Sequence, residues 1–199
     1  YGLKESGRDG DSVYLRAWDD YEFHSMKLTK SDRTGVGHIA YRTSSPEALE
    51  RRVKAIEASP YKKIGWVEGD MGHGGNKAYR FEDPFGHVFE IYYETRRYVP
   101  DEKDRSALKN YASRFHAQGV SPRRIDHVNL LGEDVKAFRQ FVETCLGSRV
   151  TEMIQLDSGR LGGVWFSCNN KTYDLVCSEE RGGGDGRLHH VTYATDQRE

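Results

Sequence analysis

The sequence predicts an α+β fold made of repeated units, each with one strand, one helix and three further strands. The main observation is a strand motif with a histidine just before an aliphatic residue, which recurs at His38, His127 and His190. A second is the alternation of apolar and polar residues in many short segments, typical of half-buried strands. A third is helical spacing of apolar residues after the strands at 35–42 and 124–131. A repeated block of this kind indicates similar units that pack side by side.

Residues 1–30 are predicted to be the tail of a first unit. Alternation predicts strands at 13–18 and 21–28, with a turn at Asp19-Asp20 between them. A second unit covers about 35–95 and opens with the strand at 35–42. Ser45 then caps a helix with Pro46 at its first position. Two strands, 76–81 and 87–93, flank a turn at 83–86.

Residues 96–123 are charged and carry Pro100 and Pro122 near their ends, which predicts a linker with a short helix near 106–115. The unit pattern then restarts over about 124–178. We expect a strand at 124–131, a helix at 135–146, and strands at 149–156, 160–167 and 171–176. A glycine-rich loop at 182–186 leads into the strand at 188–195, the head of a fourth unit.

The repeat therefore divides the chain into three parts, namely 1–95, the linker 96–123, and 124–199. It also predicts that the chain is truncated at both ends, because the first unit lacks its head and the fourth its tail. Neither end carries the linker composition that usually marks a domain boundary.

The charge balance excludes some classes of function. Thirty basic residues stand against thirty-one acidic ones, so neither nucleic acid nor an acidic membrane is expected as a partner. No apolar run approaches the roughly 18 residues of a membrane span. Cys145, Cys168 and Cys177 form no close pair and are expected as buried reduced thiols. A cytoplasmic location is the prediction.

His127 and His190 are the main candidates for chemistry, because each occupies the same place on the first strand of its unit. If these units pair face to face, the two imidazoles meet inside one half-barrel. Two histidines and a carboxylate make the facial triad of non-haem Fe(II) oxygenases, which leaves positions open for substrate and O2. The alternative is that each strand histidine only packs, with its ring nitrogens satisfied.

The second unit indicates where a carboxylate ligand would lie. Glu90, on the last strand of that unit, follows His38 by 52 residues, and the same offset from His190 gives position 242, beyond residue 199. His38 and Glu90 have the relative placement of a metal site, but a vestigial site without metal is the preferred interpretation. His24 and His73 are expected to be loop or surface residues.

The His-Val strand and the Asp83-Pro-Phe-Gly-His-Val-Phe-Glu90 segment resemble the vicinal oxygen chelate superfamily. The runs 124–131 and 186–195 make the chain most similar to the type I extradiol dioxygenases, of the catechol 2,3-dioxygenase kind. The resemblance implies half-barrels shared with glyoxalases and bleomycin-resistance proteins. It also implies a metal-free N-terminal domain and a C-terminal domain that holds Fe(II), with Mn(II) as the alternative, through His127 and His190.

The activity implied is cleavage of catechol or a substituted catechol by O2 beside its two hydroxyls, giving a 2-hydroxymuconic semialdehyde in aromatic catabolism. Catechol-type molecules and O2 are the expected partners, and a homo-oligomer is expected. The 199 residues alone are expected to be inactive without the carboxylate. The alternatives are a glyoxalase-like or a non-catalytic binding protein on the same fold.

One departure from the family concerns the pair Tyr173-Asp174, where the family usually carries His-Asp. The family's histidine is held to shuttle a proton, whereas a tyrosine donates a hydrogen bond but is a poor base at neutral pH. His189 is expected on the opposite side of its strand from His190, because side chains alternate along a strand. We expect His189 and Asp174 to support the site without binding the metal.

Overall fold

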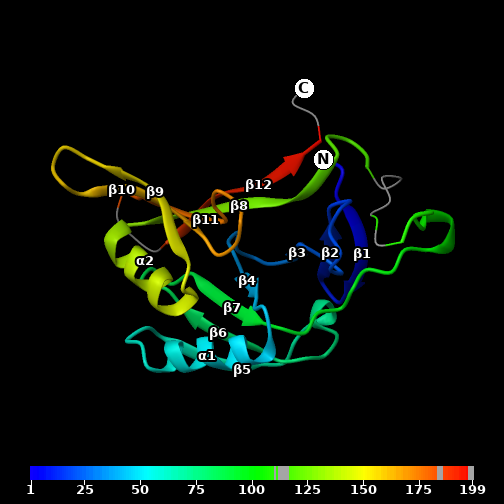
Figure 1. The fold of residues 1–199 in the computed structure, drawn as a ribbon, viewed down its shortest axis with the longest axis horizontal. Helices are drawn as coiled ribbons and strands as arrows, with labels where there is room; N and C mark the ends of the chain where they lie inside the picture. Colours follow the sequence, from blue (N-terminus) through cyan, green and yellow to red (C-terminus); the bar gives the residue numbers. More distant parts are fainter. Residues whose placement is uncertain (110, 112–116, 183–185, 197–199) are drawn as a thin grey trace.

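The computed structural model describes residues 1–109, 111, 117–182 and 186–196. These residues form three sheets with two α-helices beside them (Figure 1). The N-terminal sheet is an antiparallel meander of three strands, β1 (Lys4–Asp9), β2 (Ser12–Arg16) and β3 (Met26–Thr29). It is the observed counterpart of the predicted tail of the first unit.

The second unit forms a four-stranded sheet in the order β4-β7-β6-β5. Its elements are β4 (Ile39–Arg42), α1 (Pro46–Glu57), β5 (Lys63–Val67), β6 (Ala78–Glu82) and β7 (Val88–Tyr92). Helix α1 begins as predicted, because the Ser45 side chain accepts a hydrogen bond from Ala48 N and Pro46 takes the first position. A short 3₁₀ turn, η1 (Met71–His73), precedes β6.

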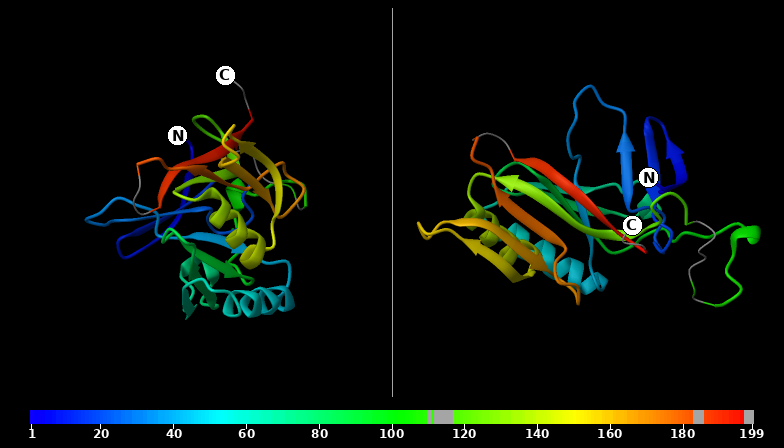
Figure 2. Two further views of the ribbon diagram at one scale, coloured as in Figure 1. Left: turned by 90° about the vertical axis from the view of Figure 1, so that its left-hand side faces the viewer. Right: turned by 90° about the horizontal axis from the view of Figure 1, so that it is seen from above.

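The third unit repeats this arrangement and adds one strand, in the order β12-β8-β11-β10-β9. Its elements are β8 (Pro122–Gly132), α2 (Val135–Phe141), the π-turn η4 (Val142–Leu146), β9 (Arg149–Gln155), β10 (Leu161–Ser167), β11 (Leu175–Glu179) and β12 (Arg187–Thr195). Strands β8 and β12 run antiparallel over most of their length (Figure 2).

The two units have the same topology. In each, the first strand lies parallel to the last, β4 to β7 and β8 to β11, and the remaining strands are antiparallel. The predicted α+β class and the βαβββ repeat are therefore confirmed. The final strand β12 pairs with β8, so the first strands of the third and fourth units lie side by side.

Several boundaries differ from the prediction. Strands β1 and β5 were not expected, only the last residues of the predicted strand 21–28 are extended, and β11 begins at Leu175, later than expected. The linker contains a 3₁₀ turn, η2 (Glu102–Asp104). Part of the helix predicted near 106–115 and most of the glycine loop at 182–186 lie outside the described residues.

One hydrophobic cluster joins the second and third units. Phe81 and Phe89 of the second unit stack in tilted ring contacts on Phe141 of the third. Removing these apolar surfaces from water is the main favourable term that holds the units together. The division at 95 and 123 stays a prediction, since the core continues across it.

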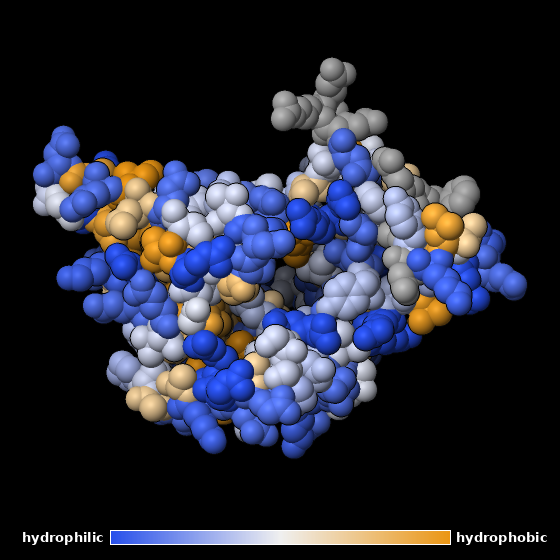
Figure 3. Space-filling view, in the orientation of Figure 1, coloured by the Kyte–Doolittle hydropathy of each residue, from blue (hydrophilic) through white to orange (hydrophobic). Residues whose placement is uncertain are grey.

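The surface shows where apolar side chains remain exposed. Figure 3 shows such side chains gathered at the end of the molecule formed by β9 and β10, where Met153 and Ile154 are each 49% exposed. Cys145 and Cys177 are buried as expected, but Cys168 is exposed, so that part of the prediction was wrong. Within the described ranges, no helix is long and apolar enough to cross a membrane.

Candidate functional site

The pairing of β8 with β12 brings His127 and His190 together. Thr192 is the direct cross-strand partner of His127, and His190 pairs with Asn129 two residues further along β8. Their rings meet nearly edge to face at 5.2 Å between centroids, and the two Nε2 atoms lie 3.1 Å apart. Two residues 63 positions apart in the chain thus direct the same ring nitrogen toward one point.

This separation suits two ligands of one metal ion. Two imidazole nitrogens that bind a metal at about 2.1 Å and at right angles to each other would lie about 3.0 Å apart. It also suits an N–H···N hydrogen bond if one of the two Nε2 atoms carries a proton. The other nitrogen of His127 limits this choice, because its Nδ1 lies 2.8 Å from the Asp126 carboxylate. With its proton donated to that carboxylate, His127 presents a lone pair on Nε2, either to a metal ion or to a proton on His190 Nε2.

His190 is also suited to bind a metal. Its burial, with the neighbouring imidazoles of His189 and His127, lowers the pKa of His190. A lowered pKa favours the neutral imidazole, which is the form that a metal requires. The Thr192 hydroxyl also lies near the pair, 3.3 Å from His127 Nε2.

His189 does not face away from His190. Its Nδ1 lies 2.6 Å from Nδ1 of His190 and the ring centroids are 4.8 Å apart. The expectation of opposite faces was wrong because the β8–β12 register shifts between Leu188 and His190, which leaves His189 as an extra residue.

The described part of the chain places no third ligand beside the histidine pair. Among the residues that the structure describes, no group of three His, Cys, Asp or Glu side chains can hold a metal ion. The register explains why the third unit supplies none. Glu90 pairs with Ala40, two residues after His38, whereas the equivalent partner of Asn129, two residues after His127, is Val176. The position of the carboxylate in the second unit is thus apolar in the third.

Tyr173 lies against the first histidine of the pair. Its ring packs edge-on to that of His127, with 4.9 Å between centroids. Asp174 supports the turn that carries it by accepting hydrogen bonds from Asn169 Nδ2 at 2.9 Å and from Cys168 N. Burial opposes the charged form, but hydrogen bonds from Lys171 and Asn169 lower the pKa of Asp174. The tyrosine therefore occupies a fixed position beside the pair.

An open cavity of about 430 Å³ borders this site, lined by Arg124, Asp126, Asn170, Lys171, Thr172 and Tyr173. Two of these residues, Asp126 and Tyr173, also contact the His127 ring. The volume falls in the range of small-molecule pockets. The lining is mainly polar and carries two cations, which would favour a polar ligand with partial negative charge.

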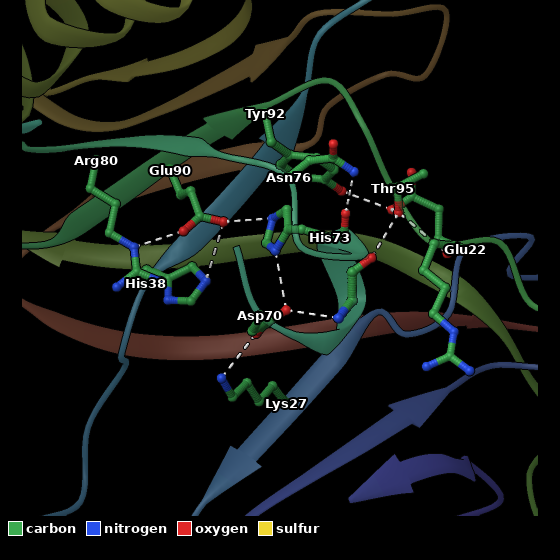
Figure 4. A network of polar contacts seen from close by, with 12 residues as sticks. Glu22, Lys27, His38, Asp70, His73, Asn76, Arg80, Glu90, Tyr92 and Thr95 are labelled. Atoms are coloured by element: carbon green, nitrogen blue, oxygen red, sulfur yellow. Dashed lines mark hydrogen bonds and ion pairs between the residues drawn. The ribbon is translucent and has the colours of Figure 1, made fainter. Parts of the chain in front are cut away.

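The equivalent centre of the second unit is filled by ion pairs (Figure 4). Glu90 is fully buried, and its Oε2 accepts a 2.7 Å hydrogen bond from Arg80 Nε. Its Oε1 lies 3.0 Å from His73 Nε2 and 3.7 Å from His38 Nε2, without an aligned hydrogen bond. His38 and Glu90 are thus near each other as predicted, but two other cations surround the carboxylate.

His73 lies in the loop between β5 and β6, one of the two expected alternatives, but it is not at the surface. It is buried in η1, where Nδ1 lies 3.1 Å from Asp70 Oδ1 and the ring packs edge-on against Tyr92. Burial opposes its charge, but the hydrogen bond to Asp70 and the adjacent carboxylate of Glu90 raise the pKa of His73 to about 9. Asp70 and His73 are three residues apart, a spacing that brings side chains together in a helical turn. This spacing is the sequence signal that could have indicated the contact between them.

The carboxylates of this network are charged as well. Burial opposes ionisation of Glu90, but His73, His38 and Arg80 lower its pKa to about 2. Asp70 also binds Lys27 Nζ at 2.9 Å, and the pKa of Asp70 is lowered well below its ordinary value. His24 lies in the loop before β3, as expected, where it is half-buried and packs edge-on against Tyr14 at 4.9 Å between centroids.

Comparisons with known proteins agree on one family of relatives. No protein-family profile matches the chain. A metapyrocatechase of Geobacillus stearothermophilus is 41% identical over 192 residues, which are 96% of this chain and 58% of that protein. A manganese-dependent 2,3-dihydroxybiphenyl 1,2-dioxygenase of Geobacillus genomosp. 3 is 37% identical over 195 residues, 98% of this chain and 61% of that protein. The chain thus spans about three fifths of the length of these relatives.

Solved structures show the same relation. The native homoprotocatechuate 2,3-dioxygenase of Arthrobacter globiformis superposes with a TM-score of 0.81 at 26% identity, over 99% of this chain and 57% of that one. The 2,3-dioxygenase LapB of Pseudomonas sp. KL28 gives a TM-score of 0.83 at 25% identity, over 98% of this chain and 67% of that one.

Proposed function

Because this chain is a relative of the extradiol ring-cleaving dioxygenases, we propose that it forms part of an enzyme that opens catechol or a substituted catechol with O2. Cleavage would occur beside the two hydroxyls and give a 2-hydroxymuconic semialdehyde. The observation that carries the proposal is the pair of Nε2 atoms 3.1 Å apart, from first strands of two successive units. Aromatic catabolism is the corresponding metabolic role.

The metal ligands proposed in this chain are His127 and His190, through their Nε2 atoms. A bound divalent metal would supply Lewis acidity that lowers the pKa of catechol hydroxyls and would leave positions for O2. Fe(II) is the proposed ion, and Mn(II) is the alternative because one relative is named as manganese-dependent. The carboxylate expected near position 242 lies outside the 199 residues and stays a prediction.

The remaining side chains would bind and orient the substrate. Arg124 and Lys171 line the cavity beside the pair and would attract the partial negative charge of catechol oxygens. Tyr173, held against His127, can donate a hydrogen bond to an oxygen bound nearby. A phenol is a poor base, so we propose that Tyr173 positions oxygen and that another group accepts the proton.

Further predictions concern the whole protein. His189 and Asp174 would support the site, while His38 and Glu90 belong to a vestigial centre without metal. The cytoplasmic location and the homo-oligomer stay predictions. So does the division into a metal-free part at 1–95 and a metal-binding part from 124.

Iron retention tests the proposal most directly. His127→Ala and His190→Ala should each lower the affinity of the protein for Fe(II) by at least about 100-fold, because each removes a ligand. His38→Ala is the matched control, since His38 has the same place on the first strand of the second unit, and should retain iron. Iron content is measured after anaerobic loading and gel filtration. If His127→Ala or His190→Ala retains as much iron as the wild type, the ligand assignment is refuted.

Activity gives an independent test. Loading a version of the protein that includes the carboxylate expected near position 242 anaerobically with Fe(II), then adding catechol and air, should produce a yellow ring-cleavage product. If iron is retained but no catechol tried gives colour, the protein is a binding protein on the dioxygenase scaffold.

A further inference from the structure

Each histidine of the facing pair follows a residue that the strand ladder leaves unpaired. On β8, Thr192 pairs with His127 and Tyr193 with Ile125, so Asp126 is an extra residue. On β12, Leu188 pairs with Leu130 and His190 with Asn129, so His189 is the extra residue. These are two β-bulges on neighbouring antiparallel strands. In both cases the extra residue directly precedes the histidine.

A bulge changes where side chains point. In a regular strand, neighbouring side chains lie on opposite faces, and a bulge breaks this alternation locally. Both extra residues consequently contact the histidine that follows. Asp126 Oδ2 lies 2.8 Å from Nδ1 of His127, and His189 Nδ1 lies 2.6 Å from Nδ1 of His190. In each contact the nitrogen involved is Nδ1, so Nε2 remains directed at the other histidine.

We propose that Asp126 and His189 are positioning residues that hold the Nδ1–H tautomer of His127 and His190, leaving both Nε2 lone pairs available to one metal ion. The inference rests on the proposed metal role of the pair. The carboxylate of Asp126 accepts the Nδ1 proton of His127. Nδ1 of His190 donates to Nδ1 of His189, which therefore carries its own proton on Nε2.

The position of the two Nε2 atoms ties these tautomers to the metal-bound state. With both Nδ1 atoms protonated, two lone pairs face each other at 3.1 Å, an arrangement that is repulsive alone and favourable with a cation between them. Without a metal, His190 Nε2 can instead carry a proton and donate it to His127 Nε2. Groups that hold the outer nitrogen of a metal-bound histidine fix its ring and raise its basicity, and their loss typically costs about 10–100-fold in metal affinity. The carboxylate of Asp126 should therefore support its histidine more strongly than the neutral ring of His189.

Tautomers can be measured without any metal. Two-bond ¹⁵N–¹H correlation spectra of the metal-free protein, labelled on histidine, should show the proton of His127 on Nδ1. Asp126→Asn should give a mixture of tautomers at His127. A wild-type spectrum with the proton of His127 on Nε2 would overturn the proposal, and this measurement needs no variant to fold.

Cobalt affinity is the second measurement, with Co(II) as the probe in competition with a chelator. Asp126→Asn should weaken Co(II) binding about 10-fold or more, because the amide oxygen still accepts but carries no charge. Asp157→Asn is the matched control on the exposed β9–β10 turn and should bind as the wild type. His189→Asn, which keeps an acceptor, should retain more affinity than His189→Leu.

The outcomes separate this inference from the proposed function. If His127→Ala binds Co(II) like the wild type, the proposed metal role fails. If His127→Ala loses Co(II) while Asp126→Asn and His189→Leu bind within twofold of the wild type, only the positioning role is overturned.

Discussion

The second and third units carry different polar centres on the same arrangement of strands. In both, a histidine directly precedes an aliphatic residue of the first strand, and that strand lies parallel to the last. In the second unit a buried carboxylate, Glu90, faces the histidine and is neutralised by protein cations. In the third, an apolar Val176 replaces it and a second histidine arrives from β12.

The difference shows how a repeated scaffold can separate stability from chemistry. The buried carboxylate of the second unit is paired with Arg80 and His73, so protein cations take the place of an added cation. The histidines of the third unit have their Nδ1 atoms occupied and their Nε2 atoms directed at each other. We therefore expect substitutions in the first centre to change folding and those in the second to change metal binding.

The largest expected effect is that of Glu90→Gln. Removing the carboxylate leaves the charges of His73 and Arg80 without their buried partner, which typically costs about 3–5 kcal/mol in the free energy of unfolding. Urea unfolding measures it, and Co(II) affinity should be unchanged. Glu68→Gln is the control, because that side chain is 78% exposed and pairs with Lys77 only at the surface. A cost below about 1 kcal/mol for Glu90→Gln would mean that the centre of the second unit stabilises the fold no more than a surface ion pair does.

The pH dependence of stability sharpens the same comparison. The pKa of His73 is raised to about 9 in the folded protein, against about 6.5 in an unfolded chain. Its contribution to the free energy of unfolding is therefore fully present below about pH 6.5 and is lost as pH rises through 9, by about 3 kcal/mol. Other groups also titrate above pH 8. The difference in the free energy of unfolding between wild type and His73→Gln therefore isolates the contribution of His73. Parallel stability curves for the two proteins between pH 6.5 and 9.5 would contradict it.

The sequence predicted the repeat because its signal is local, a histidine followed by aliphatic alternation. The sequence did not predict β5. This strand lies at the edge of its sheet, and its apolar residues Ile64 and Trp66 are half-exposed, so the segment lacks the buried face that produces a clear apolar alternation. The sequence also missed β1, because its residues are almost all polar.

The polar centres were predictable only in part. The proximity of His127 and His190 followed from the repeat, whereas the two bulges depend on how β8 and β12 pair. Bulge positions are set by tertiary register, which alternation in one strand does not reveal. His73 reaches Glu90 from a glycine-rich turn, where no periodic pattern indicates burial.

Gly186→Ala tests how closely the two units are joined. Gly186 N donates to Phe85 O at 2.9 Å, and a Cβ there would lie 2.2 Å from His87 Cε1. His87 cannot easily move, because it is buried and its Nδ1 binds Asp83 Oδ2 at 2.6 Å. We expect a loss of about 2 kcal/mol from overpacking and weaker Co(II) binding, since β12 begins at the next residue. Gly182→Ala, with only ordinary contacts, is the control.

The smallest effect compares the helix caps of the two units. Ser45 Oγ accepts one backbone N–H, from Ala48, whereas Asp134 Oδ1 accepts two, from Lys136 and Ala137 at 2.9 and 3.0 Å. An N-cap replaced by alanine typically costs about 1 kcal/mol, and a carboxylate also interacts favourably with the positive end of the helix dipole. Asp134→Ala should therefore cost more than Ser45→Ala in urea unfolding, and the difference should shrink at high salt because a charge is involved. If the two costs are equal at low salt, the units cap their helices with equal strength, and the charge adds nothing at this position.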